Sequence, residues 1–169
     1  HPVIGLLERA AGLRREDPPE HHLDRLEAML ALATEDVGAC APPLADLLGI
    51  PTGGRYPVLE LSPQQRKEQI FRALLDQLAG LAARQPVLVV YEDVHWADPT
   101  TLELIGRVVE QVQRLAVLVL ITFRPEFVPP WAGHGHVTAL SLGRLARRQG
   151  EAMVGRVTGG RALPAEVLD

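Results

Sequence analysis

Two adjacent carboxylates, Glu92 and Asp93, directly follow a largely apolar run at residues 86–91. The run is rich in β-branched side chains, which is typical of a strand buried on both faces of a parallel sheet. Ligands of open parallel sheets bind beyond the carboxyl ends of the strands, so both acids stand where a ligand would bind. One carboxylate could coordinate Mg²⁺ while the other orients or deprotonates a water molecule that attacks a phosphate. The alternative is a solvated strand end in which Asp93 begins a turn.

A guanidinium group follows the second apolar run, residues 116–122, in a similar way. The forked donors of Arg124 suit phosphate oxygens, and such a contact would be lost when the phosphate is cleaved off. Arg124 could instead be a surface residue before Pro125 or a partner of Glu126. Thr122 could assist through a hydrogen bond, although a threonine in a strand is more often structural.

The other polar and reactive residues favour structural roles. His95 has no second His or Cys at the spacing of a metal site, which favours packing or a hydrogen bond within the loop. Trp96 is predicted to cap the core beneath the loop and not to stack on a base. Asp98, which precedes Pro99, is predicted to cap the next helix. Cys40 is the only cysteine, so it excludes an internal disulfide and is predicted to be inert.

Alternating strands and helices would bring these residues together. The predicted elements are strand 86–91, a helix from Asp98, strand 116–122, strand 136–142 and helix 145–157. A strand, a helix and a second strand in succession favour a parallel pair with a crossover helix. Before them, Ser62, Pro63 and Gln65 form the signature of a capping box that begins a long helix.

The first part of the sequence is predicted to be helical. Apolar residues recur at helical spacing in 2–12 and 20–33, and a shorter apolar segment covers 43–49. The change of pattern divides the chain into a helical segment, residues 1–61, that packs on an α/β core, residues 62–169.

Composition narrows the class of protein. A chain of 169 residues that is 47% hydrophobic is long enough to bury one core of ordinary size. A formal charge of −4 without clustered Lys or Arg argues against a nucleic-acid-binding surface. No apolar run approaches the roughly 18–20 residues that span a bilayer, so a cytoplasmic location without a membrane partner is expected. Because the sequence begins without methionine, it is expected to be a piece of a longer chain.

The residues around the acidic pair resemble a known family. Segment 87–104 is similar to the Walker B region of bacterial STAND/AAA-type signalling ATPases, found beside class III adenylate or guanylate cyclase domains and in LuxR-type regulators. The resemblance continues through 121–127 and 129–131 to 162–164. It implies an α/β fold, a partial P-loop NTPase of the ASCE type whose parallel sheet has flanking helices.

The resemblance implies roles for three residues. Glu92 matches the acid that coordinates Mg²⁺. Asp93 matches the catalytic base, and an aspartate where fast ATPases often carry a glutamate suits the slow hydrolysis of a switch. Arg124 matches the sensor arginine that contacts the γ-phosphate of ATP in STAND proteins.

The sequence contains no phosphate-binding loop of the form G-x-x-x-x-G-K-[ST]. The glycine pair at 53–54 lacks the lysine and the hydroxyl, and the single lysine, Lys67, lies inside a predicted helix. The resemblance implies an upstream Walker A strand between the last two predicted strands, which would otherwise have unpaired inner edges. Residues 1–169 alone are therefore expected to bind MgATP weakly or not at all.

The predicted function is part of an ATP-binding and ATP-hydrolysing switch that regulates an attached output domain. By resemblance, the output domain is a nucleotide cyclase or a transcription regulator. One alternative is a non-catalytic interaction scaffold derived from an ATPase fold. Another is an unrelated α/β domain whose acidic strand end coordinates a divalent ion.

Overall fold

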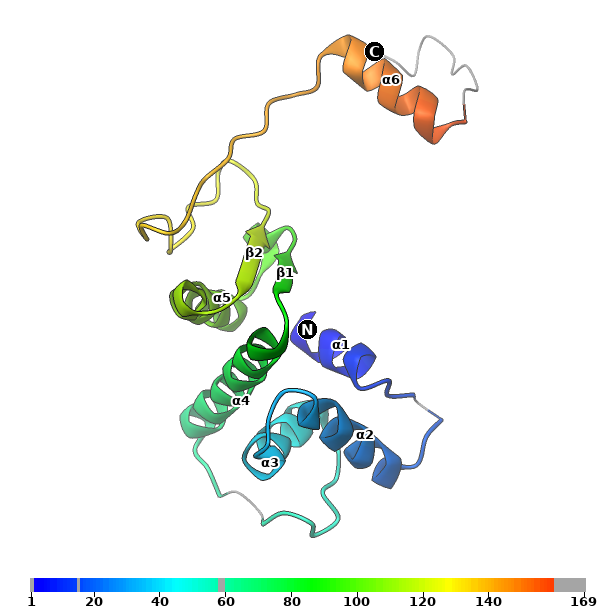
Figure 1. The fold of residues 1–169 in the computed structure, drawn as a ribbon, viewed down its shortest axis with the longest axis vertical. Helices are drawn as coiled ribbons and strands as arrows, with labels where there is room; N and C mark the ends of the chain where they lie inside the picture. Colours follow the sequence, from blue (N-terminus) through cyan, green and yellow to red (C-terminus); the bar gives the residue numbers. More distant parts are fainter. Residues whose placement is uncertain (1, 15, 58–59, 160–169) are drawn as a thin grey trace. The chain divides into compact units, whose positions relative to one another are not determined.

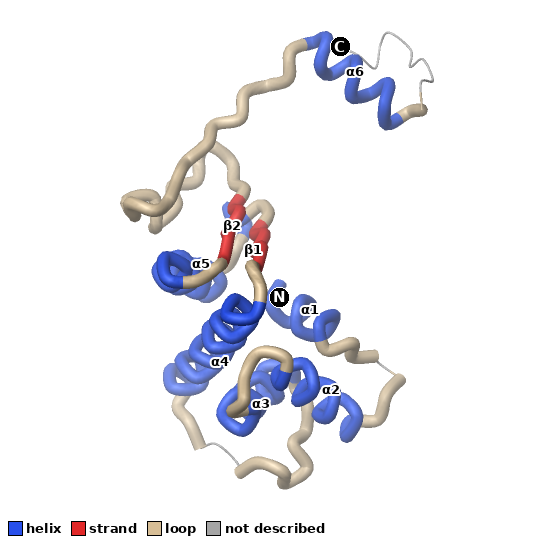
Figure 2. Tube along the Cα trace, viewed as in Figure 1, coloured by secondary structure: helices blue, strands red, loops and turns tan. Residues whose placement is uncertain are grey.

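The computed structural model describes residues 2–14, 16–57 and 60–159, which fall into two units, residues 1–133 and 134–169 (Figures 1 and 2). The elements of the first unit are the helices α1 (Pro2–Ala10), α2 (Pro19–Ala31), α3 (Val37–Leu48), α4 (Pro63–Arg84) and α5 (Pro99–Gln111), the strands β1 (Val87–Tyr91) and β2 (Val117–Ile121), and the short 3₁₀ turns η1 (Val94–Trp96) and η2 (Val112–Arg114). The second unit contains α6 (Arg147–Val157). The predicted mixture of helices with parallel strands is confirmed, in a sheet smaller than expected.

The long helix α4 begins as its sequence predicts. The Gln65 backbone N–H donates to Ser62 Oγ at 3.3 Å, and the Ser62 N–H donates to Gln65 Oε1 at 3.0 Å. These reciprocal bonds satisfy two backbone donors that the first helical turn would otherwise leave unpaired. The capping box therefore fixes the start of α4, which connects the N-terminal helices to the strands.

Helix α3 is longer than the segment predicted at 43–49. It begins after Asp36, whose side chain accepts a hydrogen bond from the Ala39 N–H at 3.0 Å, and it continues through Pro42 and Pro43. Each proline removes a helical hydrogen bond, which is why the sequence favoured a later start. Burial of the helix face that includes Ala41 and Leu44 compensates for the missing bonds.

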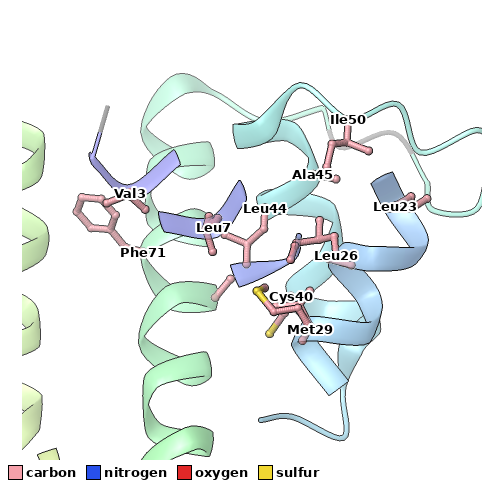
Figure 3. Close-up of a cluster of buried hydrophobic side chains, with 14 of the residues drawn as sticks. Val3, Leu7, Leu23, Leu26, Met29, Cys40, Leu44, Ala45, Ile50 and Phe71 are labelled. Carbon is pink, nitrogen blue, oxygen red and sulfur yellow. The ribbon is translucent and has the colours of Figure 1, made fainter. Parts of the chain in front are cut away.

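The hydrophobic core of the first unit lies among α1–α4. Figure 3 shows Val3 of α1 beside Phe71 of α4, and Leu7 close to Leu44 of α3. The most deeply buried large side chains in the described part of the chain are Leu26, Leu30, Leu44 and Ile105. The N-terminal helices thus pack on α4, which contributes to the same core. The division of the chain at residue 61 stays a prediction.

Ion pairs join α4 to α5 and so connect the helical core to the strand region. Arg107 of α5 donates to both carboxylate oxygens of Glu68 at 2.6 and 2.7 Å and to Glu103 at 2.9 Å. Its guanidinium also lies 5.0 Å from the ring centroid of Phe71. Lys67 of α4 bonds to Glu103 at 2.8 Å, and this bond lowers the pKa of the Glu103 carboxyl. The bidentate geometry orients α5 against α4.

Strands β1 and β2 pair in parallel, with Val87 opposite Val117 and Tyr91 opposite Ile121. Both strands and their parallel pairing confirm the sequence prediction. The expectation that the strands are buried on both faces is wrong, because one face of the pair is open to solvent. Its exposed side chains are Leu88, Val90, Leu118 and Leu120. Within the described part of the first unit, no element covers this face, and no further strand pairs with the outer edges.

The strand predicted at 136–142 does not form. This segment belongs to the second unit and has no regular secondary structure, and Leu140 and Leu142 are exposed. A strand requires backbone pairing, and none of the described residues pairs with it. Helix α6, in contrast, confirms the helix predicted at 145–157 to within two residues. The resemblance at 162–164 lies outside the described residues.

No helix in the described ranges combines the length and the apolar character needed to cross a bilayer.

Candidate functional site

The carboxyl ends of β1 and β2 bring the predicted site residues to one edge of the sheet. Because Tyr91 pairs with Ile121, the acids that follow β1 and the residues that follow β2 leave the sheet together. Glu92, Asp93 and Arg124 are all exposed there. This is the edge at which open parallel sheets bind their ligands.

Thr122 fastens the two strand ends together. Its backbone N–H donates to the Tyr91 carbonyl at 2.9 Å, and its own carbonyl accepts from the Val94 N–H at 3.0 Å. The Thr122 hydroxyl accepts a third hydrogen bond from the Asp93 backbone N–H at 3.0 Å. One residue therefore fixes the path of the chain on both sides of Asp93, which gives it a positioning role.

Asp93 adopts a left-handed backbone conformation, with φ 53° and ψ 41°. Within the described part of the chain it is the only residue other than glycine with a positive φ. Aspartate and asparagine tolerate this conformation better than most residues. Strained backbone of this kind clusters at functional sites, where the surrounding structure enforces it. Here the enforcing contact is the bond to the Thr122 hydroxyl.

The turn η1 follows Asp93 and differs from its prediction at Trp96. Val94 is buried and anchors the turn, but the Trp96 side chain is 74% exposed. The expectation that Trp96 caps the core is therefore wrong, because Val94 already occupies the inward position of this turn. The Trp96 backbone N–H donates to the Asp93 carbonyl at 3.0 Å. This bond holds the backbone of the turn, and the ring is exposed at the same edge as the acids.

Arg124 contacts this exposed ring. Its Cζ atom lies 5.6 Å from the centroid of Trp96, within the range of a cation–π interaction. Among the described residues no hydrogen bond or ion pair joins the Arg124 side chain to Glu92, Asp93 or Glu126. The loop that carries Arg124 is held by ring contacts from Phe127 to Phe123 and to the buried Trp131. The alternative pairing of Arg124 with Glu126 is not observed.

The His95 side chain packs within turn η1. Its ring centroid lies 5.1 Å from that of Trp96, and both ring nitrogens are buried. No described residue hydrogen-bonds to either nitrogen, so the imidazole acts as a packing group here.

Asp98 confirms its prediction as the N-cap of α5. Its Oδ1 accepts from the backbone N–H groups of Thr100 and Thr101, both at 3.0 Å. Its Oδ2 accepts from the Thr101 hydroxyl at 2.6 Å, and this bond is the main reason why the pKa of the Asp98 carboxyl is lowered. Both carboxylate oxygens therefore take part in the helix start.

The donor set at the strand ends suits a magnesium-bound phosphate better than a metal held by protein alone. No three His, Cys, Asp or Glu side chains gather as a metal site in the described residues. Mg²⁺ typically takes one or two carboxylates and completes its shell with phosphate oxygens and water. The exposed carboxylates of Glu92 and Asp93 fit that pattern, and the Arg124 guanidinium is a suitable partner for a phosphate oxygen.

Cys40 lies in the helical core, away from the acidic pair in the sequence. Burial raises the pKa of its thiol, which disfavours the reactive thiolate form.

Sequence reasoning predicted the acidic pair and Arg124 as site residues, which stays a prediction, and it missed how these residues are held. The contact of Trp96 with Arg124 and the hydroxyl bond of Thr122 join residues more than 25 positions apart. Such contacts depend on strand pairing, so no local sequence pattern predicts them. The one sequence signal for the exposure of Trp96 is the apolar Val94 two positions earlier, which the structure shows to be buried.

Comparison with known proteins places these features in a family. The family model described as AAA ATPase domain matches residues 4–121, which include the acidic pair and end three residues before Arg124. An uncharacterized protein of Rhizobium meliloti (strain 1021) is 32% identical over 117 residues, 68% of this chain. The chain spans only 11% of the length of that relative. No solved structure gives a significant match.

Proposed function

Because the chain belongs to the AAA ATPase domain family, we propose that it carries the hydrolysis half of an ATP-dependent signalling switch. The observation that carries the proposal is the placement of Glu92 and Asp93 after β1 and of Arg124 after the adjacent strand β2. All three face solvent at the sheet edge where a nucleotide phosphate would bind.

Each residue has a chemical role in this proposal. Mg²⁺, when bound, supplies charge stabilisation to the phosphates. The Glu92 carboxylate holds that ion, directly or through water, and the Asp93 carboxylate orients the attacking water and accepts its proton. Arg124 donates to a γ-phosphate oxygen and loses that contact after cleavage. The left-handed backbone at Asp93 and the Thr122 bond keep the base in place.

The phosphate grip is proposed to come from an upstream segment with a Walker A loop. Its strand would pair with the outer edge of β2, and its helix would cover the apolar face formed by Leu88, Val90, Leu118 and Leu120. Residues 1–169 contain no such loop, and so they lack its backbone amides and its lysine.

The switch is proposed to regulate an attached output domain, a nucleotide cyclase or a transcription regulator. The resemblance of segment 87–104 to STAND signalling ATPases supports this regulatory role. The small share of the Rhizobium meliloti relative that the chain covers is consistent with a large multidomain parent. An aspartate as the base suits slow turnover, which a switch requires.

The test uses the parent protein with its upstream segment and an Asp93→Asn variant. Asparagine tolerates the left-handed backbone and preserves the shape of the side chain, so only the acid chemistry changes. We expect MgATP binding within about threefold of wild type, with turnover reduced at least 10²-fold, the scale of general-base catalysis. The matched control, Asp98→Asn, keeps a helix cap and should retain turnover. Unchanged turnover in Asp93→Asn would remove that residue from the mechanism.

A second candidate function is a non-catalytic interaction scaffold that retains the ATPase fold. The observation that favours it is the exposed apolar face of β1 and β2, which fits a protein partner. The scaffold predicts that wild-type parent protein shows no MgATP turnover above that of Asp93→Asn.

A further inference from the structure

A large aromatic ring stands in solvent at the proposed nucleotide site. Trp96 is 74% exposed, whereas the other tryptophan, Trp131, is 3% exposed. The Trp96 N–H bonds to the Asp93 carbonyl at 3.0 Å, and Val94, two positions earlier, is buried, so the turn itself is anchored. The turn therefore carries the ring on its solvent side, directly after the acidic pair.

The ring contacts the guanidinium of Arg124, whose Cζ lies over it at 5.6 Å from the centroid. Stacking uses the face of a guanidinium, while its five N–H donors lie in the plane and point outward from the edges. Arg124 can therefore remain on the ring and still donate to a phosphate oxygen. In the described residues these donors have no carboxylate partner among Glu92, Asp93 and Glu126.

Arginine has a long flexible side chain, and fixing it on a ligand costs conformational entropy. A ring that already holds the guanidinium lowers that cost at the moment of binding. The turn η1 thus begins directly after the proposed base, Asp93, and ends with the residue that holds the proposed sensor. Three residues therefore connect the proposed base to the ring that contacts the proposed sensor.

We infer that Trp96 is a positioning residue that holds Arg124 ready for the γ-phosphate of ATP, an inference that rests on the proposed function. The ligand group is the terminal phosphate, not the base. Trp96 therefore contributes to the discrimination between nucleoside triphosphate and diphosphate, and it does so only through Arg124.

The test is a double-mutant cycle in the parent protein with its upstream segment. Wild type, Trp96→Ala, Arg124→Ala and the double variant are titrated calorimetrically with magnesium, using ADP and the non-hydrolysable β,γ-imido analogue of ATP. Trp96→Ala should weaken binding of the ATP analogue roughly two- to fivefold, the range expected for an exposed cation–π contact, and leave ADP unchanged. In the Arg124→Ala background the same change should have no effect. Trp96→Phe keeps an aromatic face and should restore most of the lost affinity.

Three outcomes separate the inference from the proposed function. If wild type binds neither nucleotide, both fail. If Trp96→Ala weakens ADP and the ATP analogue equally, the ring stacks on the base or supports the fold, and the inference alone fails. It also fails if the effect of Trp96→Ala persists unchanged in the Arg124→Ala background.

A nucleotide-free measurement tests the contact itself. The emission of Trp96 is obtained as the difference between wild type and Trp96→Phe, and again as that difference in the Arg124→Ala background. A stacked guanidinium should make the two difference spectra distinct. Identical spectra would show that Arg124 does not occupy the ring, which would overturn the inference without reference to nucleotide binding.

Discussion

The helices α1–α4 and the strand pair β1–β2 belong to the same unit, yet they bury their apolar side chains to very different extents. In the helices, Leu26, Leu30 and Leu44 are completely inaccessible to solvent. In the strands, Leu88 and Leu118 are more than 60% exposed, although the strands are as apolar as any part of the sequence. The helices bury their apolar side chains against one another, whereas the strands have one partly covered face and one exposed face.

The contrast shows which part of the molecule depends on further structure. A sheet is stable when both apolar faces are covered, and parallel sheets are almost always covered by helices on both sides. The proposed functional residues all lie at the end of the incompletely covered element. Arg107 and Glu68 join the helical region to the strand region, so under the proposed function the helices act as a support for the site at the strand ends.

The largest expected effect is on stability, and it comes from a leucine-to-alanine substitution made once in the helices and once in the strands. Leu44→Ala removes a fully buried side chain and should lower the free energy of unfolding by about 2–5 kcal/mol. Leu118→Ala, on the exposed sheet face, should change it by no more than about 0.5 kcal/mol. Urea unfolding of residues 1–169, followed by circular dichroism, measures both. Comparable losses in the two variants would show that the sheet face is covered in solution.

A second pair of variants tests packing within the helices. A Cβ at Gly80 of α4 would lie 1.8 Å from the Ala33 carbonyl oxygen, so Gly80→Ala should destabilise the fold by about 1–3 kcal/mol. A Cβ at Gly106 of α5 meets no atom within 4 Å, so Gly106→Ala should stabilise it by about 0.5–1 kcal/mol. Thermal unfolding distinguishes the signs. If both variants are stabilised, α4 does not approach Ala33 closely.

The third prediction concerns the strand end. Thr122→Val removes the hydroxyl that accepts the Asp93 N–H and should cost about 1 kcal/mol of unfolding free energy. Thr122→Ser keeps the acceptor and should lose less. In the parent protein, Thr122→Val should also reduce turnover, because the base is no longer held. Equal stability of the valine and serine variants would remove Thr122 from its positioning role.

The smallest effect is a pH dependence at the start of α5. Hydrogen bonds from Thr101 lower the pKa of Asp98, so its stabilising contribution is present above the ordinary aspartate pKa of about 3.9 and is lost as the pH falls through the lowered value. Asp98→Asn keeps the cap but cannot titrate. Its unfolding free energy should therefore fall less between pH 6 and pH 2.5, by an amount below the roughly 1 kcal/mol of a whole N-cap. Parallel pH profiles for the two proteins would contradict this.

Local signals in the sequence were sufficient for the elements that depend on local chemistry. The Ser62 capping box and the Asp98 cap formed as expected, because each depends on neighbouring residues. The two apolar strands also formed, because each is the pairing partner of the other. Residues 136–142 failed as a strand since pairing needs a partner that local sequence does not supply.

The candidate site shows the same limit. The types and spacing of Glu92, Asp93 and Arg124 predict a chemistry that remains a proposal. The contact of Trp96 with Arg124 and the hydroxyl bond of Thr122 depend on how β1 and β2 lie together. The sequence predicted that Trp96 caps the core, but Val94 is the residue of this turn that is buried, and Trp96 is exposed.

The most direct test of the central claim is a calorimetric titration of MgATP into residues 1–169 alone and into the parent protein with its upstream segment. The claim is that this chain holds the hydrolysis residues without the phosphate grip. We expect heat of binding with a micromolar Kd for the parent protein and no detectable binding at micromolar concentrations for residues 1–169. A micromolar Kd for residues 1–169 would contradict the account, because it would place the phosphate grip within this chain.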